Sequence, residues 1–135
     1  KETMKVSKQE LEAVTALSPE KRYNYFVKRI CDWEQVWTLY EDDYIVLNEA
    51  KNGKLYILLF PFKDFAEHYA TNTRGMKGVS YKSFEINEFL ETIIKKLQAN
   101  NVSNALVFPV ANGYGLNVSI IDMVKDIQSE LENYK

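Results

Sequence analysis

The segment Leu55–Phe60 places the strongest constraint on the fold, because all six of its side chains are aliphatic or aromatic. A strand with one face in water alternates apolar and polar residues, so this strand needs cover on both faces. Pro61 interrupts the apolar run, which is far shorter than the roughly 20 residues of a membrane helix. We therefore expect a central strand in a covered sheet and no membrane-spanning segment.

Short runs rich in β-branched, aromatic and aliphatic residues indicate further strands on either side of this segment. The Asn52-Gly53 pair favours a tight hairpin before it, so the first three strands should be antiparallel. Ala111 is followed by a glycine-containing turn that separates the last two strands. The predicted strands are 36–40, 44–47, 54–60, 81–86, 105–110 and 116–118.

Helix signals alternate with these strands. Ser7 and Glu10 have the spacing of a capping box, but the apolar stripe that follows is thin, so the first helix should be short and peripheral. Ser18 and Pro19 begin a second helix that extends to about Asp32. Apolar residues at helical spacing predict three more helices, at 62–70, 89–97 and 120–131.

The chain of 135 residues falls in the usual range of a single domain, and no repeat or long linker divides it. We expect one domain over residues 1–135, with a peripheral N-terminal helix at 1–18 and a core at 19–135. The alternation of helical and strand periods predicts an α+β fold. Its sheet should be mixed and mainly antiparallel, with the helices packed chiefly on one face.

The overall charge argues against nucleic-acid and membrane partners. With 17 basic and 19 acidic residues the formal net charge is −2, so no basic excess attracts phosphates or anionic lipids. Cys31 is the only cysteine and cannot form an internal disulfide, which suits a reducing compartment. The polar start, residues 1–8, shows no signal peptide, and we expect a cytoplasmic protein.

The counts of catalytic residue types favour a protein without enzymatic activity. His68 and Cys31 are the only histidine and cysteine, and a zinc site needs more nitrogen or sulfur ligands than these. The glycines at 75–78 and 113–115 lack the spacing of phosphate-binding and dinucleotide-binding loops. We therefore expect no catalytic residue, metal or cofactor. A small hydrolase that uses His68 with Cys31 or a nearby carboxylate remains the alternative.

Five residues are candidates for a binding site: Arg29, Trp33, Trp37, Arg74 and Lys77. The two tryptophans, with two tyrosines nearby, form either an aromatic platform for a ligand or partner, or a corner of the core. Arg29 offers a planar fork to a carboxylate or phosphate, or belongs to a solvated helix face with Arg22. Arg74 and Lys77 lie in a predicted loop.

Several segments in the same order resemble a known family. They are Arg22–Trp37, Leu59-Phe60-Pro61, Phe65-Ala66-Glu67, Phe89-Leu90-Glu91, and Val107-Phe108-Pro109 with Gly113. Together they span about residues 20–130 and are similar to a bacterial family catalogued as domain of unknown function 2750, which joins an aromatic-rich helix to a Trp-x-x-x-Trp turn. The resemblance implies a bacterial origin and a shared fold, and it transfers no catalytic residues.

Two classes of function remain open. The first is a binding module, of the adaptor or immunity type, that acts by occupying a protein partner or small ligand. The second is the hydrolase described above. A structural role as a homodimer-forming domain cannot be distinguished from the first by sequence.

Overall fold

The computed structural model describes residues 4–111 and 113–135. Its helical elements are α1 (Lys8–Thr15), α2 (Pro19–Trp33), α3 (Lys63–Thr71), α4 (Ile86–Glu88), the π-helical η1 (Phe89–Ile93), α5 (Ile94–Ala99), α6 (Ile120–Leu131) and the 3₁₀ turn η2 (Glu132–Tyr134). The strands are β1 (Gln35–Glu41), β2 (Tyr44–Ile45), β3 (Leu47–Glu49), β4 (Leu55–Leu59), β5 (Ser80–Glu85), β6 (Val102–Val107) and β7 (Leu116–Ser119).

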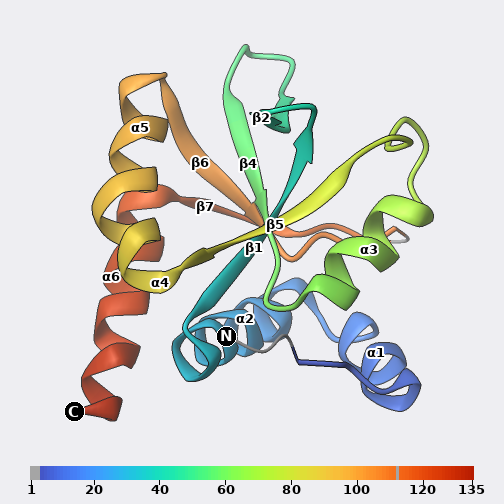
Figure 1. Cartoon of the computed structure of the whole chain (residues 1–135), viewed down its shortest axis with the longest axis horizontal. Coiled ribbons are helices and arrows are strands. Elements are labelled where there is room, and N and C mark those ends of the chain that lie inside the picture. Colours follow the sequence, from blue (N-terminus) through green and yellow to red (C-terminus); the bar gives the residue numbers. More distant parts are fainter. Residues whose placement is uncertain (1–3, 112) are drawn as a thin grey trace.

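The strands form two sheets, ordered β2-β1-β5 and β3-β4-β6-β7. Of the strand pairs in the described residues, β4–β6 is parallel and the others are antiparallel. The sheets meet where β1 and β4 cross, because Trp37 and Phe60 exchange backbone hydrogen bonds of 2.9 and 3.0 Å. The strands fan out from this crossing (Figure 1). The predicted α+β class with mainly antiparallel pairing is confirmed, although the strands divide into two sheets.

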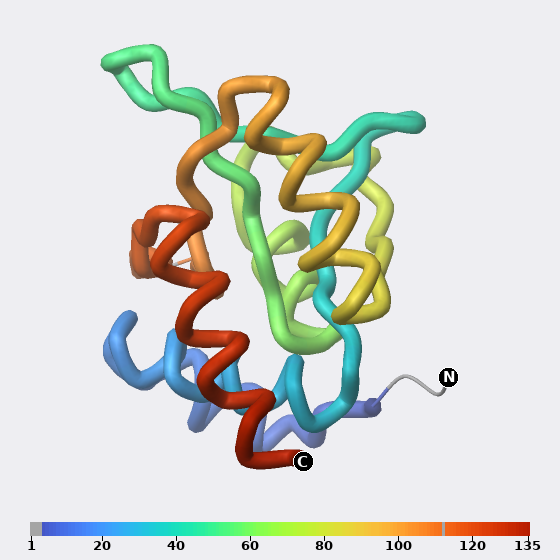
Figure 2. The backbone as a smooth tube through the Cα atoms, turned by 90° about the vertical axis from the view of Figure 1, so that its left-hand side faces the viewer, coloured from blue at the N-terminus to red at the C-terminus, as the bar shows by residue number. Residues whose placement is uncertain are grey.

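Strand β4 has the central position that its apolar sequence predicts. It lies between β3 and β6, and Ile57, Leu58 and Leu59 are all fully buried. Consecutive strand residues point to opposite faces, so both faces of β4 are covered. Helices α5 and α6 lie on one side of the strands and α3 lies on the other (Figures 1 and 2).

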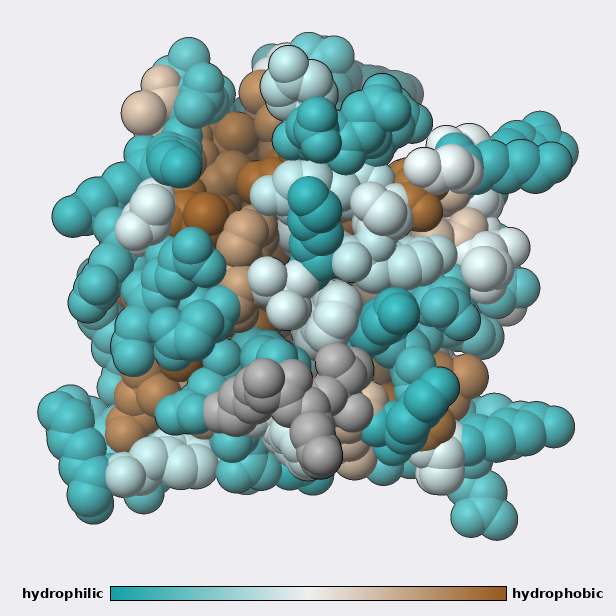
Figure 3. Space-filling view, in the orientation of Figure 1, coloured by the Kyte–Doolittle hydropathy of each residue, from teal (hydrophilic) through white to brown (hydrophobic). Residues whose placement is uncertain are grey.

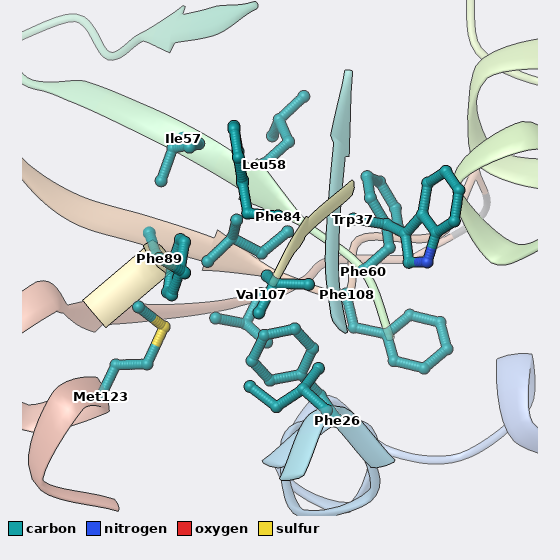
Figure 4. Close-up of a cluster of buried hydrophobic side chains, with 14 of the residues drawn as sticks. Phe26, Trp37, Ile57, Leu58, Phe60, Phe84, Phe89, Val107, Phe108 and Met123 are labelled. Carbon is teal, nitrogen blue, oxygen red and sulfur yellow. The ribbon is translucent and has the colours of Figure 1, made fainter. Parts of the chain in front are cut away.

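Aromatic side chains from distant parts of the chain dominate the interior. Phe26, Phe60, Phe89 and Phe108 are fully buried and belong to one continuous hydrophobic cluster (Figure 4). Burying a side chain of this size contributes roughly 1.5–3 kcal/mol. Within residues 4–111 and 113–135, no helix is both long and apolar enough to cross a membrane.

Three helix starts agree with the sequence prediction. The side chains of Ser7, Ser18 and Ser119 accept hydrogen bonds from the backbone N–H three residues later, at 3.1, 3.3 and 3.1 Å. These bonds satisfy backbone donors that the first helical turn leaves unpaired. The segment before α1 is held against α3, because Val6 N donates to the Asp64 carboxylate at 2.7 Å.

Most element boundaries differ from the prediction by a residue or two, the predicted strand 44–47 divides into β2 and β3, and two boundaries are displaced by three residues. The helix expected at 89–97 begins at Ile86, because the Glu85 carboxylate accepts from two backbone N–H groups and caps it. The strand expected at 105–110 runs from Val102 to Val107 instead. Phe108 has a φ of 55°, and this left-handed backbone conformation ends the strand.

Candidate functional site

The structure assigns Trp37 to the core. It lies on β1, its side chain is only 7% exposed, and it packs among the buried aromatic residues (Figure 4). Its indole nitrogen is buried and has no hydrogen-bond partner within the described residues. Trp37 is therefore a core residue, which is the second of the two alternatives that the sequence left open. It cannot form an exposed aromatic platform with Trp33.

Arg29 and Trp33 lie on one half-exposed stripe of α2, together with Tyr25. The Arg29 guanidinium sits 5.1 Å from the centre of the Tyr25 ring and 3.4 Å from the Asp32 carboxylate. Trp33 packs edge-on against Phe62 at 6.0 Å. The charge of Arg29 is therefore already compensated on the surface of α2.

The solvated-face interpretation of α2 is wrong for Arg22, which is only 3% exposed. Arg74 and Lys77 are exposed on the connection between α3 and β5, where Gly75 and Gly78 take left-handed φ angles of 88° and 83°. This connection and α2 lie at opposite ends of the molecule (Figure 1). The five predicted residues therefore do not form one site.

The structure does not assemble a cysteine–histidine pair. Cys31 is buried between α2 and α6, and its thiol donates to the Ile127 carbonyl at 3.7 Å. Burial raises the pKa of this thiol to about 12, with a smaller contribution from Glu130, so it is not a thiolate at neutral pH. His68 lines a pocket beside Arg22. Arg22 and Cys31 are nine positions apart on α2, about 13.5 Å along the helix.

Acidic side chains do not form a metal site with the single histidine and cysteine in the part of the chain that the structure describes. Within residues 4–111 and 113–135, no group of three or more histidine, cysteine, aspartate or glutamate residues could hold a metal ion.

An apolar groove between the β1–β2–β3 end of the sheets and the helix formed by η1 and α5 is the strongest candidate site. Its volume is about 390 Å³. It is lined by Tyr40, Asp43, Tyr44, Ile45, Leu47, Ile93, Lys96, Leu97, Asn100 and Val102. Figure 3 shows hydrophobic surface in a hollow between α5 and the central strands.

The course of the chain explains why apolar side chains are displayed at this groove. Asp42 has a φ of 55° and turns the chain after β1. Residues Tyr44–Ile45 then pair with β1, and Leu47–Glu49 pair with β4, so one short segment passes from the first sheet to the second. At this passage Tyr44 is 78% exposed and Leu47 is 36% exposed.

The helix formed by η1 and α5, with its C-cap Asn100, supplies the opposite wall of the groove. Ile93 and Leu97 are 8% and 5% exposed and close its floor, whereas Lys96 and Asn100 are exposed at its rim. Asp43 lies on the strand side of the same groove. The groove thus has an apolar floor and a polar rim, which is the usual composition of a protein interface.

Sequence reasoning placed Tyr44 and Leu47 in a strand and did not identify the groove. The only available signal was the Asp42-Asp43 turn followed by a large aromatic residue. Its partner helix is about 50 residues away along the chain, so the juxtaposition depends on the tertiary structure.

A family model described as "Protein of unknown function (DUF2750)" matches residues 23–127. This match covers every residue that lines the groove and leaves α1 and the first turn of α2 outside. No curated protein matches the chain.

Proposed function

The chain belongs to the DUF2750 family of proteins of unknown function, and we propose that it is a binding module whose apolar groove receives a segment of a partner protein. One observation carries this proposal. Among the described residues the exposed large hydrophobic side chains are Tyr44, Leu47, Tyr114, Ile121 and Tyr134, and two of these five flank the same groove. Isolated exposed apolar residues are normal, but a gathered set marks a contact surface.

The edges of the sheets indicate how the partner is held. Strands β2 and β3 have two and three residues, so they offer few backbone groups for the addition of a partner strand. Recognition must therefore depend on side chains. An amphipathic helix presents apolar side chains at positions i, i+3, i+4 and i+7, and this pattern suits a groove with a narrow apolar floor.

The rim favours a partner helix that carries both charges. Lys96 lies on α5 and Asp43 lies on the strand side, so acidic and basic residues that flank the apolar stripe would each find an opposite charge. Tyrosine is among the residues that contribute most to binding at interfaces, and Tyr44 is the central contact of the proposal. We place this interaction in the bacterial cytoplasm, because the buried Cys31 and the family resemblance support that setting.

A peptide-display selection on the full chain tests the proposal. We expect the selected peptides to share apolar residues at helical spacing. Leu47→Ala and Tyr44→Ala should each weaken a selected peptide at least about tenfold, a change of about 1.4 kcal/mol. Tyr114→Ala is the matched control, because Tyr114 is 84% exposed but does not line the groove.

Three outcomes would contradict the proposal. The first is a selection whose peptides lack helical spacing, and the second is equal loss of binding in the Tyr44→Ala and Tyr114→Ala variants. The third is a dimer, measured by light scattering, that dissociates when Leu47 is changed to Glu, because a second copy of the chain would then occupy the groove.

A further inference from the structure

Arg22 is a buried cation that forms no salt bridge with an acidic side chain of the described residues. Within residues 4–111 and 113–135, its guanidinium donates only to backbone carbonyls: Nε to Phe108 O at 3.2 Å, Nη1 to Thr15 O at 3.5 Å and to Leu17 O, and Nη2 to Tyr114 O. Carbonyl dipoles satisfy these N–H groups but carry no net charge.

The electrostatic surroundings leave the positive charge only partly balanced. Burial lowers the pKa of Arg22, and the opposing attraction of Glu20 is the smaller of the two effects. Arginine nevertheless stays protonated in proteins. A full positive charge therefore lies in the first turn of α2, where a bound anion would neutralise it.

A pocket of about 530 Å³ opens beside this guanidinium. It is lined by Thr15, Ala16, Leu17, Pro19, Arg22, His68, Val110, Ala111, Gly113 and Tyr114. His68 comes from α3, so elements from three regions of the sequence meet here. Asn112 lies outside the described residues.

A side chain at position 113 would narrow the pocket beside Nη2. A Cβ at this position would lie 3.9 Å from Nη2 and 3.0 Å from Val110 Cγ2. The positive-φ glycines are Gly53, Gly75 and Gly78, so the backbone conformation does not require glycine at 113. Nη2 carries two N–H groups, and Tyr114 O accepts from one of them. No described residue accepts from the second N–H, which can therefore bind a ligand.

We propose that this pocket binds a carboxylate carried on a small apolar group, with Arg22 Nη2 as the charged donor and His68 as a second polar contact. A hydrogen bond between two charged groups is roughly twice as strong as one between neutral groups. Ala16, Leu17, Pro19 and Val110 supply apolar walls for the remainder of the ligand. A phosphate, with three strong acceptor oxygens, would find too few donors.

Two sources share this ligand chemistry: a free short-chain acid and the C-terminal residue of a peptide. The site shares no residue with the groove between α5 and the strands. A negative result for carboxylate binding at this pocket would therefore not count against the proposed binding of a partner segment in the groove, and the reverse holds as well.

An NMR titration of the full chain tests the site. N-acetyl-L-alanine should shift the backbone signals of Gly113 and Tyr114 and the side-chain signals of Arg22 and His68. We expect a dissociation constant on the order of 1 mM for so small a ligand. N-acetyl-L-alaninamide, the neutral match, should bind at least about tenfold more weakly. Propionate represents the free short-chain acid, and N-acetyl-L-alanine represents the C-terminal residue of a peptide. The carboxylate that binds more tightly shows which of the two sources the pocket prefers.

Equal affinity for the acid and its amide would overturn the proposal, and so would equal affinity for inorganic phosphate. Because Arg22 also holds two loops together, the variants change its neighbours. Gly113→Ala should weaken binding about tenfold while the spectrum stays native, and His68→Ala should weaken it several-fold. Glu67→Ala, an exposed position on α3 that does not line the pocket, is the control. If Gly113→Ala disturbs the fold, His68→Ala decides, and unchanged binding in His68→Ala overturns the proposal.

Discussion

Thr38 joins the two sheets, and its substitution tests whether this junction stabilises the fold. The residue is fully buried on β1, and its hydroxyl donates to the Leu58 carbonyl of β4 at 2.6 Å. Thr38→Val keeps the shape of the side chain but replaces the hydroxyl with a methyl group. A carbon approaches a carbonyl oxygen only to about 3.3 Å, so the strands would have to separate by about 0.7 Å.

The expected cost follows from these two effects. Losing a buried hydrogen bond costs about 1–3 kcal/mol, and the displacement of a packed strand adds about 1 kcal/mol. Thr38→Val should therefore lower the free energy of unfolding by about 2–4 kcal/mol. Thr38→Ser retains the hydroxyl and loses one methyl group, which should cost only about 1 kcal/mol.

Urea unfolding, followed by the fluorescence of Trp33 and Trp37, measures both variants. The midpoints should fall in the order wild type, Thr38→Ser, Thr38→Val, with an unchanged dependence of the free energy on urea concentration. For a chain of this size, 1 kcal/mol corresponds to roughly 3–4 °C in Tm. If Thr38→Val is no less stable than Thr38→Ser, the hydroxyl does not hold the two sheets together.

Three further predictions concern stability and reactivity. Tyr23 donates to the Asp126 carboxylate at 2.5 Å between α2 and α6. A double-mutant cycle of Tyr23→Phe and Asp126→Ala should therefore give a coupling of about 1 kcal/mol, and additive single effects would contradict this bond. Because burial raises the pKa of Cys31 to about 12, against about 8.5 when unfolded, its contribution to stability is complete below about pH 8.5 and is lost as the pH rises toward 12. A disulfide reagent at pH 8 should modify this thiol only in urea, and rapid reaction of the folded chain would refute the assignment. Asp42→Gly should raise the free energy of unfolding by about 0.5–1 kcal/mol, because glycine adopts a φ of 55° without strain, and thermal melting should show a higher Tm.

Local signals in the sequence predicted the helix starts and the central strand. The caps at Ser7 and Ser18 each accept a hydrogen bond from a backbone N–H three residues away. The apolar residues of β4 do not alternate with polar ones, and this pattern alone indicates that both faces of the strand are buried. Boundaries that depend on a single residue's backbone were predicted less well. Phe108 has a left-handed φ that its own side chain does not favour, and packing in the core holds it there.

Long-range pairing limited the prediction of the sheets. The run 44–47 was expected to be one strand, but its two ends pair with different strands in different sheets. The register of each pair is set by contacts with β1 and β4. A composition rich in β-branched and aromatic residues predicts a strand and leaves its partner undetermined.

The candidate binding residues show the same limit. Arg29, Trp33 and Trp37 were chosen by residue type, but exposure separates them, because Trp37 faces the interior and Arg29 is paired with Asp32. Arg22 appeared to belong to a solvated helix face, yet its guanidinium binds carbonyls 86 and 92 residues further along the chain.

The α+β class, the capped helices and the buried character of β4 follow from local sequence patterns, because hydrophobic period and capping act over a few residues. Which apolar side chains stay at the surface, and which charge is buried, depends on the packing of the whole chain. Tyr44 and Leu47 line a groove because the chain passes between two sheets beside α5. Arg22 lies at a pocket because two distant loops close over it. Exposure depends on which segments pack together, and residues far apart in the chain determine that packing.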